Sequence, residues 1–130
     1  IVCLDNEPEV LAGMEALLRE WGSSIETAGS ADAITSRRIG FPRLRHIWPD
    51  VILADYHLDN GQTGLEAIAR IRTASGFEIP AIIITADHST DIQREIRNAG
   101  LVQLRKPVKP AALRAVLTQA ALTRKRSAAE

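Results

Sequence analysis

The sequence VILADYHLD occupies residues 51–59. It begins with four apolar residues, 51–54, and this apolar run ends at a carboxylate, Asp55. Pro49 and Asp50 precede the run and a polar, glycine-containing segment follows it, so the run predicts a short strand buried on both faces. Asp55 is the last residue of that strand. It therefore falls at the strand's carboxyl end, the edge where open α/β sheets form their binding crevices. The sequence thus predicts a functional site around Asp55.

Length and composition indicate a single globular domain. The chain has 130 residues, 45% hydrophobic and 25% charged, an ordinary composition for a soluble domain. Its zero net charge gives no electrostatic reason for nucleic acid or an anionic membrane to be the main partner, so we expect neither contact. The lone Cys3 excludes an intrachain disulfide and is expected to be a small buried hydrophobe, which fits a cytoplasmic setting. The chain opens on a predicted strand without Met, and we interpret it as a domain of a longer protein.

Strand and helix patterns alternate along the rest of the chain. Apolar runs predict strands at residues 1–4, 81–85 and 101–104, and a weaker alternating segment predicts an edge strand at 24–28. Helical spacing of apolar residues follows each strand, with Ser30 and Thr90 expected to cap two of the helices and Gly40-Phe41-Pro42 to end one. The alternation predicts a flavodoxin-like (βα)5 fold, a doubly wound parallel five-stranded sheet in the order 2-1-3-4-5.

Four polar side chains fall at the carboxyl ends of the predicted strands. Three of them are Asp5, Asp55 and Thr85, and Lys106 follows the fifth strand, so all four are expected to converge on one edge of the sheet. Hard oxygen ligands bind a divalent cation, an ammonium neutralises phosphoryl oxygens, a hydroxyl donates a hydrogen bond, and a free carboxylate oxygen attacks phosphorus. The pattern therefore predicts phosphoryl transfer.

These motifs together resemble one protein family. They are Leu4-Asp5-Asn6-Glu7-Pro8, Asp55, Thr85-Ala86 and Lys106-Pro107. The sequence is similar to the CheY-like receiver domain of response regulators in two-component signalling, over residues 1–122. Residues 123–130, with the cluster Arg124-Lys125-Arg126, are expected to form a basic C-terminal tail or linker. Each motif is weak alone, but four in order at the predicted strand ends are highly specific.

The resemblance implies that Asp55 accepts a phosphoryl group from a histidine of a histidine kinase domain or a histidine phosphotransfer protein. Mg²⁺ is the implied cofactor, held by Asp5, Asn6, Asp55 and the backbone carbonyl of His57. Thr85 and Lys106 then contact the phosphoryl group, and the peptide bond before Pro107 is cis. The domain itself catalyses part of the transfer and a slow dephosphorylation of its own. Receivers of this family often form homodimers through the fourth and fifth helices and the fifth strand, so a homodimer is one option, which nothing in residues 90–122 demands.

Several positions depart from the family pattern. The second acid after the first strand is replaced by Asn6, which predicts weaker Mg²⁺ binding, and Glu7 either compensates or faces solvent. Asp59 either tunes metal or water near the site or stabilises its loop. Gln103 stands where the family often has an aromatic switch residue, which leaves a shift led by Thr85 as the expected switch. His57 and Asp87 occupy the two variable positions that modulate phosphoryl lifetime in the family.

Three functions fit these patterns to different degrees. The first is a phosphorylatable receiver, and the alternative is a degenerate receiver that acts as a protein-interaction module. An enzyme of another flavodoxin-like class is disfavoured, because the acidic turn Asp5–Pro8 has no glycine to cradle a flavin or nucleotide phosphate. The run Leu104–Pro110 is most similar to receivers at the C-terminal end of hybrid sensor histidine kinases. The implied location is cytoplasmic, alone or within a membrane-anchored kinase.

Overall fold

The computed structural model describes residues 1–38, 40 and 44–129, with residues 123–129 as backbone only. The elements are β1 (Val2–Leu4), α1 (Pro8–Glu20), β2 (Glu26–Ala28), α2 (Ala31–Ser36), η1 (Arg45–Ile47), β3 (Ile52–Asp55), η2 (Asp59–Gly61), α3 (Gly64–Ser75), β4 (Ala81–Thr85), α4 (Thr90–Asn98), β5 (Val102–Arg105) and α5 (Pro110–Ala129). The elements η1 and η2 are single 3₁₀ turns. None of the helices in the described part of the chain is long and apolar enough to cross a membrane.

The five strands form one parallel sheet in the order β2-β1-β3-β4-β5. This order confirms the predicted flavodoxin-like fold and the edge position of β2. The register places Leu4 beside Ala54 and Asp55 beside Ile84, so β1, β3 and β4 end close to one another. Because all strands run in the same direction, their carboxyl ends meet at one edge of the sheet.

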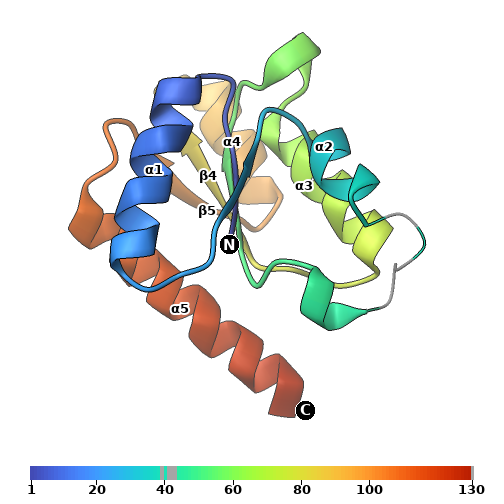
Figure 1. Ribbon diagram of the computed structural model, residues 1–130. Helices are drawn as coiled ribbons and strands as arrows, with labels where there is room; N and C mark the ends of the chain where they lie inside the picture. The colour runs from blue at the N-terminus through green and yellow to red at the C-terminus, as the bar shows by residue number, and fades with distance from the viewer. Residues whose placement is uncertain (39, 41–43, 130) are drawn as a thin grey trace.

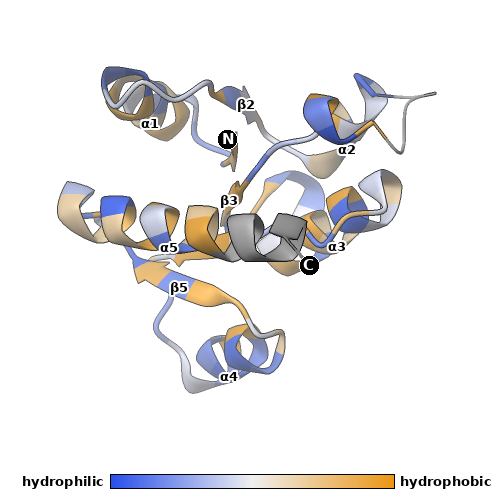
Figure 2. Ribbon diagram, turned by 90° about the horizontal axis from the view of Figure 1, so that it is seen from below, coloured by the Kyte–Doolittle hydropathy of each residue, from blue (hydrophilic) through white to orange (hydrophobic). Residues whose placement is uncertain are grey.

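Successive residues of β1, β3 and β4 pack into two different cores. Val2 and Leu4 belong to a cluster with α2, α3 and Ile96 of α4, whereas Cys3 between them packs with α1 and Leu113 of α5. Figure 1 shows α1 and α5 on one side of the sheet and α2 and α3 on the other. In Figure 2 the strands are largely hydrophobic, between helices with hydrophilic outer surfaces. The prediction that Cys3 is buried is confirmed, because only 2% of its surface is exposed. Burial raises the pKa of its thiol to about 12.

Three predictions about helix ends can be compared with the structure: the cap at Ser30, the cap at Thr90 and the end of the second helix. Ser30 is the N-cap of α2, and its hydroxyl accepts a hydrogen bond from the backbone of Ala33. The prediction that Thr90 caps α4 is wrong, because Ser89 has the extended conformation of the cap and Thr90 is already helical. Helix α2 ends at Ser36, before Gly40.

Some sequence predictions fall where the structure gives no description. Phe41 and Pro42, expected to help end the second helix, lie outside the described residues. The backbone of residues 123–129 continues α5, and the side chains of Arg124, Lys125 and Arg126 lie outside the described part of the chain. The assignment of residues 123–130 to a tail or linker therefore stays a prediction.

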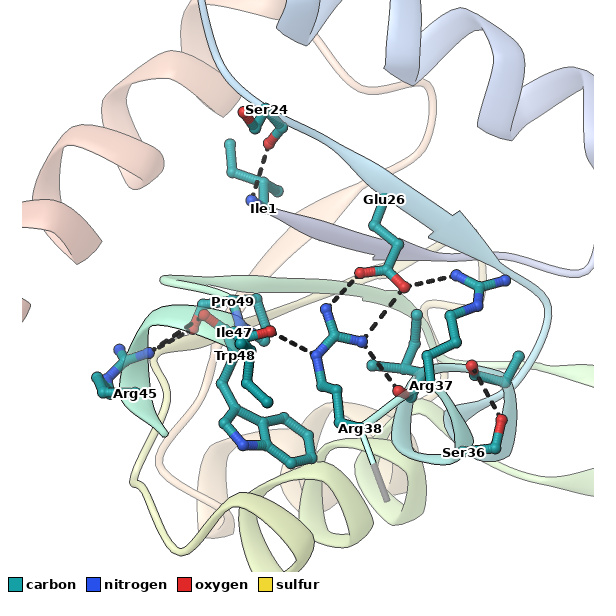
Figure 3. A network of polar contacts seen from close by, with 12 residues as sticks. Ile1, Ser24, Glu26, Ser36, Arg37, Arg38, Arg45, Ile47, Trp48 and Pro49 are labelled. Atoms are coloured by element: carbon teal, nitrogen blue, oxygen red, sulfur yellow. Dashed lines mark hydrogen bonds and ion pairs between the residues drawn. The ribbon is translucent and has the colours of Figure 1, made fainter. Parts of the chain in front are cut away.

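A network of arginines ties β2 to the segments beside it at the amino-terminal end of the sheet (Figure 3). The guanidinium of Arg38 donates to both carboxylate oxygens of Glu26 and to the backbone carbonyls of Ile34 and Ile47. Arg37 adds a further ion pair with Glu26. Burial alone would raise the pKa of Glu26, but the hydrogen bonds and charges of the two arginines outweigh it and hold that pKa below the usual value. The network fixes β2 as an edge strand.

Glu26→Gln is expected to lower the free energy of unfolding by about 1 kcal/mol at neutral pH, because the ion pairs of Glu26 with Arg37 and Arg38 lose their negative charge. The pKa of Glu26 is depressed in the folded state, so the ionised side chain stabilises the fold above its ordinary pKa. That contribution is lost as the pH falls through the depressed value. Urea unfolding at neutral pH and at pH about 3 measures the effect. A difference from the parent protein that stays constant between these pH values would contradict it.

Candidate functional site

Three side chains predicted from the sequence meet at the carboxyl edge of the sheet. The Nζ atom of Lys106 lies 3.0 Å from Oδ2 of Asp55 and 3.2 Å from Oδ2 of Asp5. The two carboxylates are buried, with 7% of Asp55 and 4% of Asp5 exposed, and Lys106 is half-buried. One ammonium thus bridges two acids that would otherwise repel each other.

The two acids keep Lys106 charged. Burial alone would lower the pKa of Lys106, but the hydrogen bonds and charges of Asp55 and Asp5 outweigh burial and raise that pKa above the usual lysine value. A raised pKa means that the ammonium is protonated throughout the physiological range. The peptide bond between Lys106 and Pro107 is cis, and the backbone N–H of Lys106 donates to the carbonyl of Thr85 at 3.0 Å.

Backbone hydrogen bonds position both acids. Asp5 donates its N–H to the carbonyl of Ala28, and its Oδ1 accepts a hydrogen bond of 2.9 Å from the N–H of Glu7. The residue after Asp55 donates its N–H to the carbonyl of Ile84, which continues the ladder between β3 and β4. Both acids therefore sit at the ends of paired strands, where the sheet limits their movement.

Gly64 allows the next helix to approach the acceptor strand closely. Its N–H donates to the carbonyl of Tyr56 at 2.7 Å. A Cβ atom at this position would lie 2.4 Å from the carbonyl oxygen of Asp55 and 2.8 Å from Cδ1 of Ile83. Only glycine fits this contact, so α3 begins directly against the backbone of Asp55.

Thr85 is fully buried and its hydroxyl is engaged with the loop that follows β4. The N–H of Asp87 donates to Oγ1 of Thr85 at 2.9 Å, and Oδ1 of Asp87 accepts from the N–H of Ser89, also at 2.9 Å. Oδ2 of Asp87 lies 3.6 Å from Nε2 of His57. The hydrogen bond from the backbone of Ser89, helped by the neighbouring His57, outweighs the effect of desolvation and lowers the pKa of Asp87. This chain of contacts connects the loop after β3 to the start of α4.

The other predicted site residues lie around this centre. Asn6 and Glu7 are exposed, directly after Asp5. The carboxylate of Asp59 lies against Gly29, in the loop after β2, where a Cβ atom on Gly29 would be 2.7 Å from its Oδ2. Gln103 is half-buried in β5, in register with Ile83 of β4.

The chemistry of the donor set suits Mg²⁺. Two carboxylates face a single ammonium, and the amide of Asn6 and the backbone of His57 lie on loops that leave the same ends of β1 and β3. In the described part of the chain, no three His, Cys, Asp or Glu side chains gather as a metal site. Mg²⁺ commonly takes one or two carboxylates and keeps several waters, so an acid pair supplemented by neutral oxygens fits this ion.

An apolar groove adjoins the acid pair. It has a volume of about 450 Å³ and runs between α1 and the loop that precedes α5. Asp5 and Lys106 stand at its edge, and its walls are mostly apolar: Cys3, Leu4, Val10, Met14, Ile84, Pro107 and Val108. A partner side chain that approaches Asp55 would therefore find apolar surface beside the charged centre.

Two features of the site were missed by the sequence reasoning. One is the close approach of Gly64 to Asp55, although a glycine at the end of a loop was visible as a signal. The other is Tyr56, which is buried and whose hydroxyl donates to Oε2 of Glu95 at 2.7 Å. The signal for Tyr56 was an aromatic residue directly after the predicted acceptor.

Comparison with known proteins gives one family and one curated relative. The family model described as the response regulator receiver domain matches residues 1–118. The phyllosphere-induced regulator PhyR of Methylorubrum extorquens is 32% identical over 121 residues, which cover 92% of this chain and 42% of that protein. The chain therefore spans about two-fifths of the length of this relative.

Solved structures share the fold at low sequence identity. CheY4 of Vibrio cholerae matches with a TM-score of 0.73 at 21% identity, covering 92% of this chain and 95% of that one. A CheY-like receiver domain protein of Methanospirillum hungatei has a TM-score of 0.78 at 19% identity, with coverages of 97% and 95%. The receiver domain of NtrX from Brucella abortus has a TM-score of 0.77 at 20% identity, with coverages of 94% and 98%. These likenesses show the arrangement of strands and helices.

Proposed function

The chain belongs to the response regulator receiver domain family of two-component signalling, and on this basis we propose that Asp55 accepts a phosphoryl group from a phosphohistidine. The observation that carries the proposal is the position of Asp55 at the end of β3, with the ammonium of Lys106 on its Oδ2. A carboxylate oxygen attacks phosphorus, the new P–O bond forms as the P–N bond of the donor breaks, and the electron pair returns to the imidazole.

In this proposal Lys106 and Thr85 bind the oxygens of the transferred phosphoryl group. Lys106 already contacts Asp55, so its ammonium lies where the charge of phosphoryl oxygens develops. The hydroxyl of Thr85 donates to the backbone carbonyl of Asp87 at 3.4 Å, and it must turn away from that carbonyl to donate to a phosphoryl oxygen. That turn moves the loop after β4, which is the structural change that phosphorylation would produce.

Asp5, Asn6, Asp55 and the carbonyl of His57 are the proposed holders of Mg²⁺. When bound, the ion supplies positive charge that offsets the repulsion between the acids and the incoming phosphoryl oxygens. Asn6 contributes an oxygen without a charge, so the proposal includes weaker ion binding than an acid at this position would give.

The proposed partners are histidine kinase domains or histidine phosphotransfer proteins. The apolar groove beside Asp5 and Lys106 suits the apolar face of a helix that presents the phosphohistidine. This assignment also predicts that the cytoplasm is the site of action, since the donors are cytoplasmic domains. A hybrid sensor kinase as the whole protein stays a prediction, and the domain layout of the full-length gene tests it.

Incubation with Mg²⁺ and acetyl phosphate is expected to add one phosphoryl group to the chain, seen as a shift in intact mass. Asp55→Asn removes the nucleophile and is expected to abolish the shift completely, because an amide nitrogen or oxygen does not replace a carboxylate in this attack. The matched control is Asp91→Asn, an exposed aspartate on α4, which is expected to react like the parent protein.

The alternative function, a degenerate receiver that acts as an interaction module, predicts a different set of outcomes. It predicts no mass shift with acetyl phosphate, no shift with a cognate kinase, and no response to beryllofluoride, a mimic of the phosphoryl group. That combination would replace the phosphoacceptor proposal. Chelation of Mg²⁺ with EDTA separates ion-dependent labelling from nonspecific acylation.

A further inference from the structure

Tyr56 joins the acceptor strand to helix α4. It follows Asp55 directly, 6% of its surface is exposed, and its hydroxyl donates to Oε2 of Glu95 at 2.7 Å. Burial, followed by the hydrogen bond and charge of Glu95, raises the pKa of Tyr56 to about 12. The phenol is therefore a hydrogen-bond donor at any physiological pH, and its partner is a carboxylate, which makes the bond charge-assisted.

Helix α4 has a small apolar attachment to the domain. Within α4, all of whose residues are described, Ile96 is the one buried side chain. Figure 2 shows α4 as a mostly hydrophilic helix set apart below β5. Ile92, partly buried, also packs against this core. A helix held by two apolar side chains shifts at lower cost than a fully packed one, so a polar tether carries a large share of its positioning.

The start of α4 is tied to the same region by a second route. The N–H of Ser89, the cap residue of α4, donates to Asp87, and Asp87 in turn contacts Thr85 and His57. The ring of His57 stands edge-on to that of Tyr56, with centroids 4.9 Å apart. When the hydroxyl of Thr85 turns towards a phosphoryl oxygen it releases the carbonyl of Asp87, and the start of α4 is then free to shift.

Tyr56 does not follow that movement. Its N–H donates to Ile84 of β4 and its carbonyl accepts from Gly64, so the backbone holds it in the sheet. A shift of α4 therefore stretches the bond between the phenol and Glu95.

We propose that the Tyr56–Glu95 hydrogen bond is a latch that holds α4 in its unphosphorylated position and couples that helix to the state of Asp55. The inference rests on the proposed function. It assigns the aromatic part of the switch to the residue after the acceptor, whereas the family more often places an aromatic at the position of Gln103. Tyr56 acts as a positioning residue, through α4.

The latch predicts that Tyr56→Phe binds beryllofluoride more tightly. The variant keeps the ring in its buried place and removes only the hydroxyl. It is expected to lower the dissociation constant for beryllofluoride in the presence of Mg²⁺ about fivefold, the scale of one partly exposed charge-assisted hydrogen bond. Backbone amide NMR titration measures the constant, and amide hydrogen exchange over residues 90–98 is expected to be faster in the free variant.

Three further variants make the test specific. Glu95→Ala is expected to match Tyr56→Phe, and the double variant is expected to equal either single variant, because one bond is lost in all three. Asp91→Ala removes a carboxylate from the same helix and keeps the latch, so its dissociation constant is expected to stay within about twofold of the parent value.

The outcomes separate the latch from the proposed function. If the parent protein binds beryllofluoride and Tyr56→Phe binds it equally or more weakly, the latch is refuted and the phosphoacceptor proposal stands. Additive effects of Tyr56→Phe and Glu95→Ala would also refute it. If the parent protein neither binds beryllofluoride nor takes up a phosphoryl group from acetyl phosphate or a cognate kinase, the phosphoacceptor proposal falls and the latch falls with it.

Discussion

Gly64→Ala is expected to lower the free energy of unfolding by about 3 kcal/mol or more. The added Cβ atom would lie 2.4 Å from the carbonyl oxygen of Asp55, which belongs to the backbone of a central strand. It would also lie 2.8 Å from Cδ1 of Ile83, a fully buried side chain. Neither atom has room to retreat, so α3 must move away from β3 or the strand must bend.

The matched control is the same substitution in an open position. Gly13 lies inside α1, and a Cβ atom there meets no atom within 4 Å. Gly13→Ala is expected to raise the free energy of unfolding by about 0.5 to 1 kcal/mol, because alanine is the better helix former. Urea unfolding of both variants measures the change in the free energy of unfolding, which is expected to be negative for Gly64→Ala and positive for Gly13→Ala. Equal effects in the two variants would show that close approach at Gly64 is not the cause.

Gly64→Ala is also expected to slow the phosphorylation of Asp55 by acetyl phosphate, because the substitution displaces the backbone of Asp55.

Lys106→Met is expected to lower the free energy of unfolding by about 2 kcal/mol when Mg²⁺ is removed with EDTA. The ammonium bridges Asp55 and Asp5, and its loss leaves two buried carboxylates facing each other without a counter-charge. Breaking a fully buried ion pair costs more, but Lys106 is half-buried and water screens part of the repulsion. Added Mg²⁺ is expected to raise the free energy of unfolding more in this variant than in the parent protein. In the variant no ammonium competes with the ion for the carboxylates of Asp5 and Asp55.

Lys109→Met is the control for that variant. Lys109 is an exposed lysine in the same segment, so its loss removes the same charge and leaves the acid pair intact. Urea unfolding in EDTA and in Mg²⁺ is the measurement for both. If the two variants behave alike, the bridging role of Lys106 is wrong. Lys106→Met is also expected to take up a phosphoryl group without the amide NMR shifts in residues 86–98 that are expected of the parent protein.

The strand ends could be predicted from the sequence because two signals coincide there: an apolar run ends, and a polar residue follows it. The run before Asp55 is apolar and a loop with Asp59, Asn60 and Gly61 follows it, and apolar runs likewise stop on a polar residue at Asp5 and Thr85. A parallel sheet then brings the ends together whatever the lengths of the helices between them. This is why the convergence of acids and lysine followed from local patterns alone.

Contacts between distant segments could not be predicted in the same way. Tyr56 and Glu95 are separated by 39 residues, and no local pattern connects an aromatic residue after a strand to a glutamate inside a polar helix. The start of α4 was misplaced for a local reason: Ser89 and Thr90 both suit a cap, and backbone conformation decides between them. The approach of Asp59 to Gly29 depends on how two loops fold over the sheet.

The alternation of strand residues between two cores limits how this domain can change its length. Deleting one residue within β3 would send Leu53 to the core of Ile52 and Ala54 and turn Asp55 away from its neighbours. An insertion in residues 57–63 leaves every strand residue on its own side. Insertions and deletions that preserve the domain are therefore confined to its loops, and the spacing from Ile52 to Asp55 is a fixed part of the architecture.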